Sequence, residues 1–273
     1  MTVPALRCSG LVHVYRVSGT DVAALRGIDL DLPAGRSLAL LGPSGSGKST
    51  LLQIVAGVLR PSAGRVEVFG EDVGTASPRR LERVRARSLG VLLQGPANNL
   101  LLHETARQNV EFVAREDSGR RAGMELLAAE SLDHDRRPTG LLGPSEQQVA
   151  ALAVALSGSP ALLIADEPTS RLDPAGRERM LDLMLRATAG IGAALMVVTH
   201  DEAVARRMDR MIHLRDGRIS EEVTAHGRFA VLGSDGSVQL PPEVLDDRWR
   251  PGGLIEVTRD GETVSLRLVR ADR

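Results

Sequence analysis

The sequence predicts an α/β fold built on parallel strands. The first observation is a short apolar strand that runs into a glycine-rich loop and then into a helix. The second is that two later apolar strands end in carboxylate or imidazole side chains. The chain has 273 residues, 42% of them hydrophobic and 25% charged, which suits one large domain with an appendage.

The glycine-rich loop is the most specific element. Residues 37–41 read as a buried strand and residues 51–56 as the helix that follows. Between them the chain matches the phosphate-binding pattern G-x-x-x-x-G-K-[ST], in which glycines let backbone N–H groups point inward and the helix N-terminus adds positive charge. A flexible Gly/Ser turn is the alternative, but it does not account for the ordered strand, loop and helix. The predicted ATP-binding loop is Gly42, Pro43, Ser44, Gly45, Ser46, Gly47, Lys48, Ser49 and Thr50.

Lys48 is the only lysine among the 34 Lys and Arg residues of the chain. Its ammonium is a compact charge that fits between two phosphates, whereas a guanidinium is a wide planar fork. We expect Lys48 to reach the β and γ phosphates and the Ser49 hydroxyl to hold Mg²⁺. The cofactors predicted from this loop are ATP and Mg²⁺.

A second apolar strand, residues 161–167, ends in two carboxylates. Asp166 is placed to hold Mg²⁺, directly or through water, and Glu167 to orient and polarise the attacking water. Pro168 then forces the chain out of strand geometry. A strand followed by a charged turn would look the same in isolation, so the phosphate loop upstream is what favours a catalytic role.

Two further strand ends complete the predicted site. Residues 193–201 form an apolar strand that ends in His200, one helix after the acidic strand, so the two strand ends should be neighbours in a parallel sheet. His200 would then touch the γ-phosphate and the attacking water. Gln94 follows residues 90–93 and could reach Mg²⁺ and the water from the other side. His200 also fits a surface residue, and a single Gln is a weak signal.

The composition of the chain limits the kinds of partner and location that we expect for it. The formal net charge of −1 gives no electrostatic case for nucleic acid, so no nucleic-acid partner is expected. The one cysteine, Cys8, cannot form an intrachain disulfide. There is no apolar run near the roughly 20 residues that cross a bilayer, and the first residues show no signal-peptide pattern. These observations predict a cytoplasmic protein that another subunit would have to anchor to a membrane.

Together these motifs resemble the ABC-type ATPases, the nucleotide-binding subunits of ATP-binding-cassette systems, over about residues 8–219. Residues 23–30 and 209–219 resemble the lipoprotein-release, macrolide-efflux and cell-division group. The resemblance implies a RecA-like P-loop core with an N-terminal antiparallel β layer, an ATPase domain over 1–222 and a helical lobe at about 98–158. It also implies that Tyr15 stacks on adenine, although Tyr15 fits a plain strand as well.

The resemblance implies a dimer of cassettes in which the phosphate loop of one subunit faces a Leu-Ser-Gly-Gly-Gln/Glu signature of the other. Here Gly143, Pro144 and Ser145 replace the Ser-Gly-Gly of that signature, whereas Glu146 and the partner-facing turn at Asp173 match. Pro144 removes an N–H donor, and Ser145 is a candidate cap or substitute hydroxyl. The leading hypothesis is a heteromeric pair whose second ATPase subunit supplies a complete signature; a homodimer is the alternative.

The tail, residues 227–273, reads as a small β-rich C-terminal appendage because short alternating runs are separated by Gly and Asp-Gly turns. Its strand order resembles the swapped-hairpin barrels of some bacterial regulators. It carries one more acidic than basic residue, which argues against DNA. Dimerisation, regulation and a solvated appendage without a distinct role all remain open.

The leading function is an ATP-hydrolysing subunit that powers an integral membrane permease from the cytoplasmic face of the cell membrane. Two alternatives remain. One is a non-transport ABC ATPase acting on ribosomes or DNA, although this chain has neither a second cassette nor a long coiled-coil insertion. The other is a non-hydrolysing regulatory subunit, which the altered signature favours and the intact Glu167 and His200 oppose.

Overall fold

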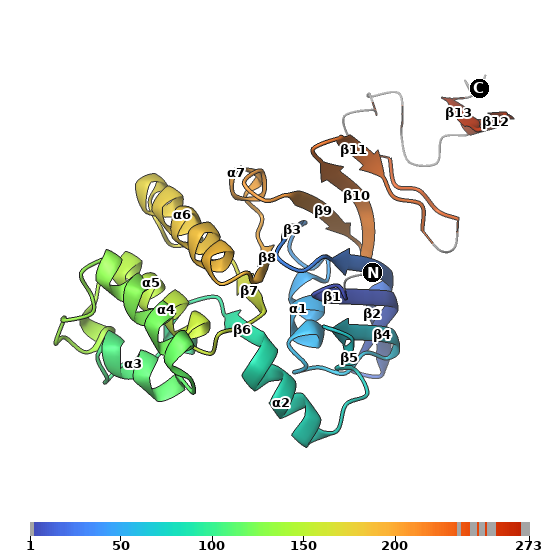
Figure 1. The fold of residues 1–273 in the computed structure, drawn as a ribbon. Helices are drawn as coiled ribbons and strands as arrows, with labels where there is room; N and C mark the ends of the chain where they lie inside the picture. The colour runs from blue at the N-terminus through green and yellow to red at the C-terminus, as the bar shows by residue number, and fades with distance from the viewer. Residues whose placement is uncertain (1–2, 234–235, 241–244, 246–248, 250–254, 269–273) are drawn as a thin grey trace.

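The computed structural model describes residues 3–233, 236–240, 245, 249 and 255–268. Within them the chain folds around two β-sheets with helices alongside, which confirms the predicted α/β class with a P-loop core (Figure 1). Parts of the tail that the sequence predicts as turns and strands, at 234–235, 241–244 and 250–254, lie outside the described residues.

The larger sheet has seven strands in the order β11-β10-β9-β3-β8-β7-β6. Strand β3 lies between β8 and β9 and is parallel to both, and β7 joins β8 to β6, also in parallel. The predicted neighbourhood of the acidic strand and the His200 strand is therefore correct. The bounds are β3 (Ser37–Leu41), β6 (Leu89–Leu92), β7 (Leu162–Asp166), β8 (Ala194–Val198), β9 (Arg210–Arg215), β10 (Arg218–Thr224) and β11 (Gly227–Ala230).

The second sheet is the antiparallel layer that the family resemblance implies. Its four strands run in the order β2-β1-β4-β5, with β1 (Leu6–Val17), β2 (Thr20–Leu32), β4 (Ala63–Val68) and β5 (Glu71–Asp72). Buried apolar side chains of this layer and of β3, β7 and β8 pack with α1 (Lys48–Val55) into one core cluster. The helix that follows the phosphate loop is thus held between the two sheets.

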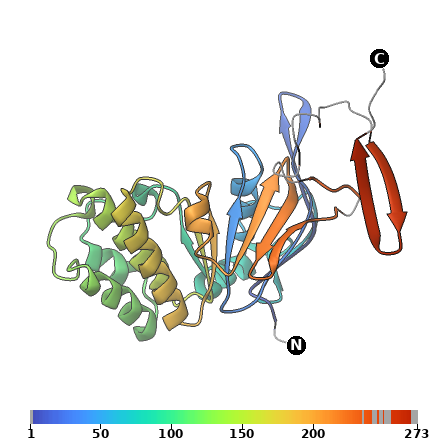
Figure 2. The same cartoon turned by 90° about the horizontal axis from the view of Figure 1, so that it is seen from above.

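The other side of the larger sheet carries α5 and α6 with α3 and α4 beyond them, as Figures 1 and 2 show, whereas α2 packs with the first cluster through Leu81 and Val84. A second core cluster joins that side of the sheet to α5 and α6. The helical elements are α2 (Pro78–Ser88), η1 (Pro96–Asn98), α3 (Ala106–Val113), α4 (Asp117–Ala129), η2 (Thr139–Leu141), α5 (Pro144–Leu156), α6 (Pro174–Gly190) and α7 (Glu202–Ala205). No helix in the described part of the chain is long and apolar enough to cross a membrane.

The tail begins inside the larger sheet. Strand β11 pairs with β10 in antiparallel register, so the first strand beyond residue 227 belongs to the cassette's own sheet. The division of the chain near this residue stays a prediction. Farther on, β12 (Ile255–Asp260) and β13 (Thr263–Leu268) form a separate two-stranded hairpin whose described side chains are almost all exposed.

Candidate functional site

The phosphate loop leaves β3 and enters α1 in a conformation that requires glycine at two positions. Gly42 has φ +153°, and a Cβ there would collide with the carbonyl oxygen of Leu214. Gly47, the residue before α1, has φ +106°, and a Cβ there would lie 2.5 Å from the carbonyl oxygen of Ala24. The loop is therefore packed against strands on both sides, and α1 begins at Lys48 with its N-terminus toward the loop.

Lys48 folds back onto its own loop. Its Nζ donates hydrogen bonds to the carbonyl oxygens of Gly42 at 2.7 Å and Pro43 at 2.9 Å. Burial lowers the pKa of Lys48 from its ordinary value, while the negative charges of Glu167 and Asp166 act in the opposite direction. The ammonium thus lies in a partly desolvated position where phosphate oxygens would replace two neutral acceptors by charged ones.

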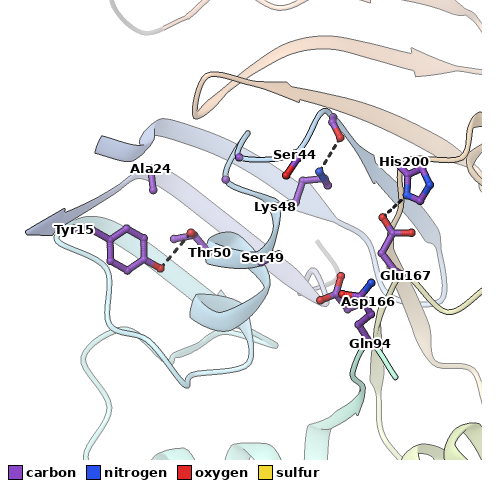
Figure 3. Close-up of a pocket in the computed structure, with 13 residues that line it drawn as sticks. Tyr15, Ala24, Ser44, Lys48, Ser49, Thr50, Gln94, Asp166, Glu167 and His200 are labelled. Carbon is purple, nitrogen blue, oxygen red and sulfur yellow. Dashed lines mark hydrogen bonds and ion pairs between the residues drawn. The ribbon is translucent and has the colours of Figure 1, made fainter. Parts of the chain in front are cut away.

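A single cavity of about 660 Å³ gathers most of the predicted site (Figure 3). Pro43 and Ser46 do not line it: Pro43 lines a neighbouring cavity, and Ser46 is buried beneath the loop. Ala24 of β2 also lines the cavity, a position that no sequence pattern marks. The lining residues are Tyr15, Ala24, Gly42, Ser44, Gly45, Gly47, Lys48, Ser49, Thr50, Gln94, Asp166, Glu167 and His200.

The two carboxylates follow directly from β7. Asp166 is the last residue of the strand, and burial, followed by repulsion from Glu167, raises its pKa. Glu167 has φ +46°, and its N–H donates to the carbonyl of Val198 at 2.8 Å, which ties the end of β7 to the end of β8. The left-handed backbone is a strained conformation for glutamate and turns its side chain toward the cavity.

His200 lies beside Glu167, as the strand order predicts. Its Nδ1 lies 2.7 Å from Oε1 of Glu167, and the carboxylate accepts this hydrogen bond. The Glu167 side chain is 14% exposed and that of His200 is 69% exposed. His200 therefore fixes the orientation of the buried carboxylate while much of its own ring stays accessible to a ligand.

Gln94 enters the cavity from a loop that one asparagine shapes. Asn99 Oδ1 accepts from the Leu93 N–H at 2.8 Å, and its Nδ2 donates to the carbonyls of Leu93 and Gly95 at 2.9 and 3.1 Å. Sequence reasoning missed Asn99, although an asparagine shortly after a strand end is a common turn-forming signal.

At the other end of the cavity, Tyr15 presents its ring from β1. The ring packs edge-on to His13 with centroids 4.6 Å apart, and the hydroxyl lies 3.3 Å from Thr50 Oγ1. Tyr15 is 36% exposed, so one side of the ring is open to the cavity. An aromatic face that opens into the cavity suits the flat base of a nucleotide.

The turn between β9 and β10 supports the phosphate loop from behind. The Gly217 N–H donates to the carbonyl of Ser46 at 3.1 Å, and the Gly217 carbonyl accepts from Arg26 at 2.8 Å. A Cβ on Gly217 would lie 2.7 Å from the carbonyl oxygen of Ala24. This Asp-Gly turn was read from the sequence only as part of the family resemblance, yet it connects the loop to both sheets.

The signature segment departs from its expected shape. Helix α5 starts at Pro144, and Gly143 is the N-cap residue, so Ser145 does not cap the helix as the sequence suggested. Glu146 Oε2 accepts the Gly143 N–H at 2.6 Å, and Arg137 donates to Glu146 Oε1 at 2.9 Å. Pro144 occupies the first helical position, where proline is favoured because no N–H is needed there.

Ser145 and Glu146 line a second cavity of about 300 Å³ together with Asp173. Asp173 is itself the N-cap of α6, and its Oδ1 accepts the Gly176 N–H at 2.8 Å. The signature and the partner-facing turn predicted from the sequence are therefore neighbours on one surface, separate from the residues that line the phosphate cavity.

Comparisons with known proteins agree with this geometry. Residues 25–170 match the family model of the ABC transporter. The chain is similar to the lipoprotein-releasing system ATP-binding protein LolD of Ruegeria sp. (strain TM1040), with 39% identity over 231 residues, 81% of this chain and 100% of the relative. LolD 1 of Caulobacter vibrioides is 38% identical over 232 residues, 82% of this chain and 98% of the relative.

Solved structures with a similar fold are also ATP-binding cassettes of ABC transporters. The dimeric ATP-binding cassette MJ0796 bound to ADP and Pi has a TM-score of 0.72 and 29% identity, covering 81% of this chain and 99% of that chain. CbiO1 of Clostridium perfringens, part of the ABC transporter complex cbiONQ, has a TM-score of 0.70 and 28% identity over 80% of this chain and 88% of that chain.

The relatives named as lipoprotein-releasing proteins confirm the predicted subgroup, and the family match favours a transport subunit over the two other functions considered from the sequence. The chain belongs to the ABC transporter family as an ATP-binding subunit, an ATPase whose hydrolysis of ATP is coupled to transport.

Proposed function

We propose that ATP binds with Mg²⁺ in the 660 Å³ cavity and is hydrolysed there. The observation that carries the proposal is that Lys48, Gln94, the pair Asp166 and Glu167, and His200 come from four separate segments of the chain and line this one cavity. The phosphate loop binds the phosphates through its N–H groups and Lys48, and Tyr15 stacks on adenine.

The residues near Lys48 fit a magnesium ion. Mg²⁺ prefers hard oxygen ligands and is usually held by one or two carboxylates together with substrate phosphates. The Ser49 hydroxyl, the Asp166 carboxylate and the Gln94 amide oxygen supply this donor set in the cavity. The ion would neutralise phosphate charge.

Glu167 orients the attacking water and accepts its proton. His200 keeps the Glu167 carboxylate in place through the 2.7 Å hydrogen bond and can approach the γ-phosphate with its exposed ring. Lys48 moves from the carbonyls of Gly42 and Pro43 to the β and γ phosphates when ATP enters. Each of these movements is a side-chain rotation within the cavity.

The proposed partners are a second ATPase subunit and an integral membrane permease, which together hold this chain at the cytoplasmic face of the cell membrane. The cassette MJ0796 is dimeric in its solved structure, and that likeness supports a pair here. Gly143 lacks the hydroxyl of the serine that it replaces, and Pro144 lacks the N–H of the glycine that it replaces. We therefore propose a heteromeric pair whose other member offers a complete signature.

Turnover tests this proposal. Purified chain alone is assayed for ATP hydrolysis beside Glu167→Gln, and the native mass of the assembly isolated from cells is measured. We expect weak or no turnover alone and a second ATPase subunit in the assembly. Turnover that Glu167→Gln abolishes, together with an ATP-dependent homodimer and no second ATPase subunit, would replace the heteromeric pair by a homodimer.

The single lysine offers a direct test of where ATP binds. An amine-reactive reagent can label only Lys48 and the N-terminal amine, and mass spectrometry separates the two peptides. We expect Mg²⁺ with ATP to slow the labelling of Lys48 at least about tenfold and to leave the N-terminal amine unaffected. Because the pKa of Lys48 is lowered, its unliganded labelling should rise at lower pH than that of an ordinary lysine. Equal labelling with and without ATP would exclude phosphate contact with Lys48.

A further inference from the structure

Helix α2 carries an unusual concentration of positive charge. Its 11 residues, PRRLERVRARS, contain five arginines and one glutamate, in a chain whose formal net charge is −1. All five arginines are exposed. Two of them have structural partners: Arg80 binds Glu71 at 2.6 Å, and Arg85 donates to the carbonyls of Ala56, at 2.9 Å, and Gly57 at the end of α1.

The other three, Arg79, Arg83 and Arg87, form what we term the arginine stripe. They are spaced four residues apart, so they lie along one side of the helix over roughly 12 Å. No hydrogen bond or ion pair links the side chain of any of the three to another residue in the described part of the chain. The fold therefore uses Arg80 and Arg85 and leaves the stripe to solvent.

Helix electrostatics do not explain the stripe. Like charges at this spacing repel one another and destabilise a helix. Arg87 lies in the last turn, where the helix dipole favours a cation, but Arg79 lies in the first turn, where the dipole opposes it. An external anion is the remaining source of stabilisation.

The composition of the surface distinguishes between kinds of anionic partner. Protein interfaces are centred on buried apolar and aromatic groups, and the only exposed apolar side chain among the described residues of α2 is Pro78, at its first position. Nearby, Val58 is 70% exposed and follows Gly57, whose carbonyl Arg85 binds. A row of arginines beside small apolar residues suits a layer of anionic lipid headgroups, which bind basic segments by charge alone.

We propose that the arginine stripe of α2 binds the anionic headgroups of the membrane beside which the transporter works. This inference rests on the proposed location at the membrane. Helix α2 leads into β6, which ends two residues before Gln94, and Arg85 joins it to the end of α1 (Figure 1). The lipid contact would thus fix the edge of the cassette that leads to both the phosphate-loop helix and the Gln94 loop.

The test is sedimentation of the purified full chain with vesicles of phosphatidylcholine alone or with about a third of phosphatidylglycerol. We expect binding to the anionic vesicles only, weakened by salt. Each basic residue near a membrane contributes about fivefold to binding, so replacing Arg79, Arg83 and Arg87 by Gln should weaken it about a hundredfold. The matched control replaces Arg121, Arg136 and Arg186 by Gln, because these arginines are exposed elsewhere and their replacement removes the same charge. Its binding to the anionic vesicles should stay within about twofold of wild type.

Three results would overturn the proposal: no binding of the wild-type chain to anionic vesicles, equal losses in both triple variants, or vesicle binding by the stripe variant as strong as wild type. In the last case, loss of a co-purifying protein or nucleic acid from the stripe variant would assign the stripe to that macromolecule instead. Protection of Lys48 by ATP is measured in the same samples, so a failure of the ATP site is seen separately from a failure of lipid binding.

Discussion

The proposed ATP site has two halves, one that this chain keeps for itself and one that it would present to a partner, and the two differ in how they are built. The first half holds several costly features: Glu167 at φ +46°, a buried Ser46 hydroxyl without a hydrogen-bond partner, and Gly42 at φ +153° against Leu214. The second half, at the start of α5, is an ordinary helix start, in which Glu146 accepts the Gly143 N–H and Pro144 has no N–H.

Strain and unpaired polar atoms persist where a ligand needs them and are removed where packing alone decides. The Gly143-Pro144 start of α5 is good for helix stability, because Glu146 accepts the Gly143 N–H and Pro144 begins the helix. It leaves no hydroxyl at position 143 and one N–H fewer for a phosphate. The chain therefore looks specialised for binding ATP in its own cavity rather than for completing the site of another subunit.

Lys48→Ala tests the retained half most severely. Two charge-assisted hydrogen bonds to phosphates are worth about 1.5–3 kcal/mol each, so ATP affinity should fall by about two to four orders of magnitude. Titration calorimetry measures the loss, and Lys48→Arg should not restore binding because the guanidinium is too wide.

Glu167→Gln is the control for Lys48→Ala, since it should keep ATP affinity while losing turnover. Near-normal ATP binding by Lys48→Ala would mean that the cavity is not the nucleotide site, and the contrast between the two halves would then have no basis.

Restoring the signature tests the altered half. The triple variant Gly143→Ser, Pro144→Gly, Ser145→Gly supplies a hydroxyl at position 143 and an N–H at position 144, which should strengthen ATP-dependent self-association by about two to four orders of magnitude in the Glu167→Gln background. The serine fits, because Gly143 has φ −68° and an added Cβ would lie 3.4 Å from Glu146 Oε2. Analytical ultracentrifugation with and without ATP measures the effect.

The same triple variant should melt at a lower temperature than wild type, because two glycines replace residues that restrict the unfolded chain. Pro144→Ala alone serves as the control for self-association, because it adds an N–H at position 144 but no serine at position 143. Unchanged self-association of a folded triple variant would show that features other than the signature prevent this chain from pairing with itself.

Local patterns predicted most of the residues that line the phosphate cavity. The phosphate loop, Asp166 and His200 each belong to a strand with a polar end, and parallel strands bring such ends together whatever lies between them. Asn99, Ala24 and the Gly217 turn were missed as parts of the site, because they act through backbone contacts that no side-chain pattern reveals.

The helix start at Gly143 shows the opposite limit of sequence reasoning. The sequence offered Ser145 as a candidate cap, but the cap position depends on where the helix begins, and proline at position 144 sets that point. The first tail strand was likewise read as part of an appendage because its pairing with β10 is a tertiary contact.

Tyr15 provides a smaller test within the retained half. If its ring stacks on adenine, Tyr15→Ala should weaken ATP binding about tenfold, since stacking of a base on an aromatic ring is worth about 1–3 kcal/mol. Tyr15→Phe should bind like wild type, because the hydroxyl contact with Thr50 is long at 3.3 Å. Fluorescence titration with an ATP analogue measures both. Equal losses in the two variants would assign the effect to the hydroxyl rather than to the ring.

Asp166 gives the smallest effect, and its sign decides whether the retained half is held at a cost to stability. The pKa of Asp166 is raised by burial and by Glu167, so the fold favours the protonated form. A raised pKa contributes stability only at low pH, and that contribution is lost as the pH rises through the folded-state pKa. At pH 7 the ionised carboxylate therefore destabilises the nucleotide-free chain, and Asp166→Asn should raise its Tm by a few degrees at most, given about 2–4 °C per kcal/mol in domains of about 150–250 residues.

The pH dependence and the ligand distinguish this cause from a general gain in packing. Below about pH 4 the carboxyl is protonated in the folded and unfolded chains alike, so the two Tm values should converge. With Mg²⁺ and ATP present the order should reverse, because only the wild-type carboxylate gains from a nearby cation. A lower Tm for Asp166→Asn at pH 7 without ligand would mean that Lys48, which lines the same cavity, already compensates for the negative charge of Asp166. The retained half would then be stable before ATP arrives, and the contrast with the α5 start would rest on Glu167 and the phosphate loop alone.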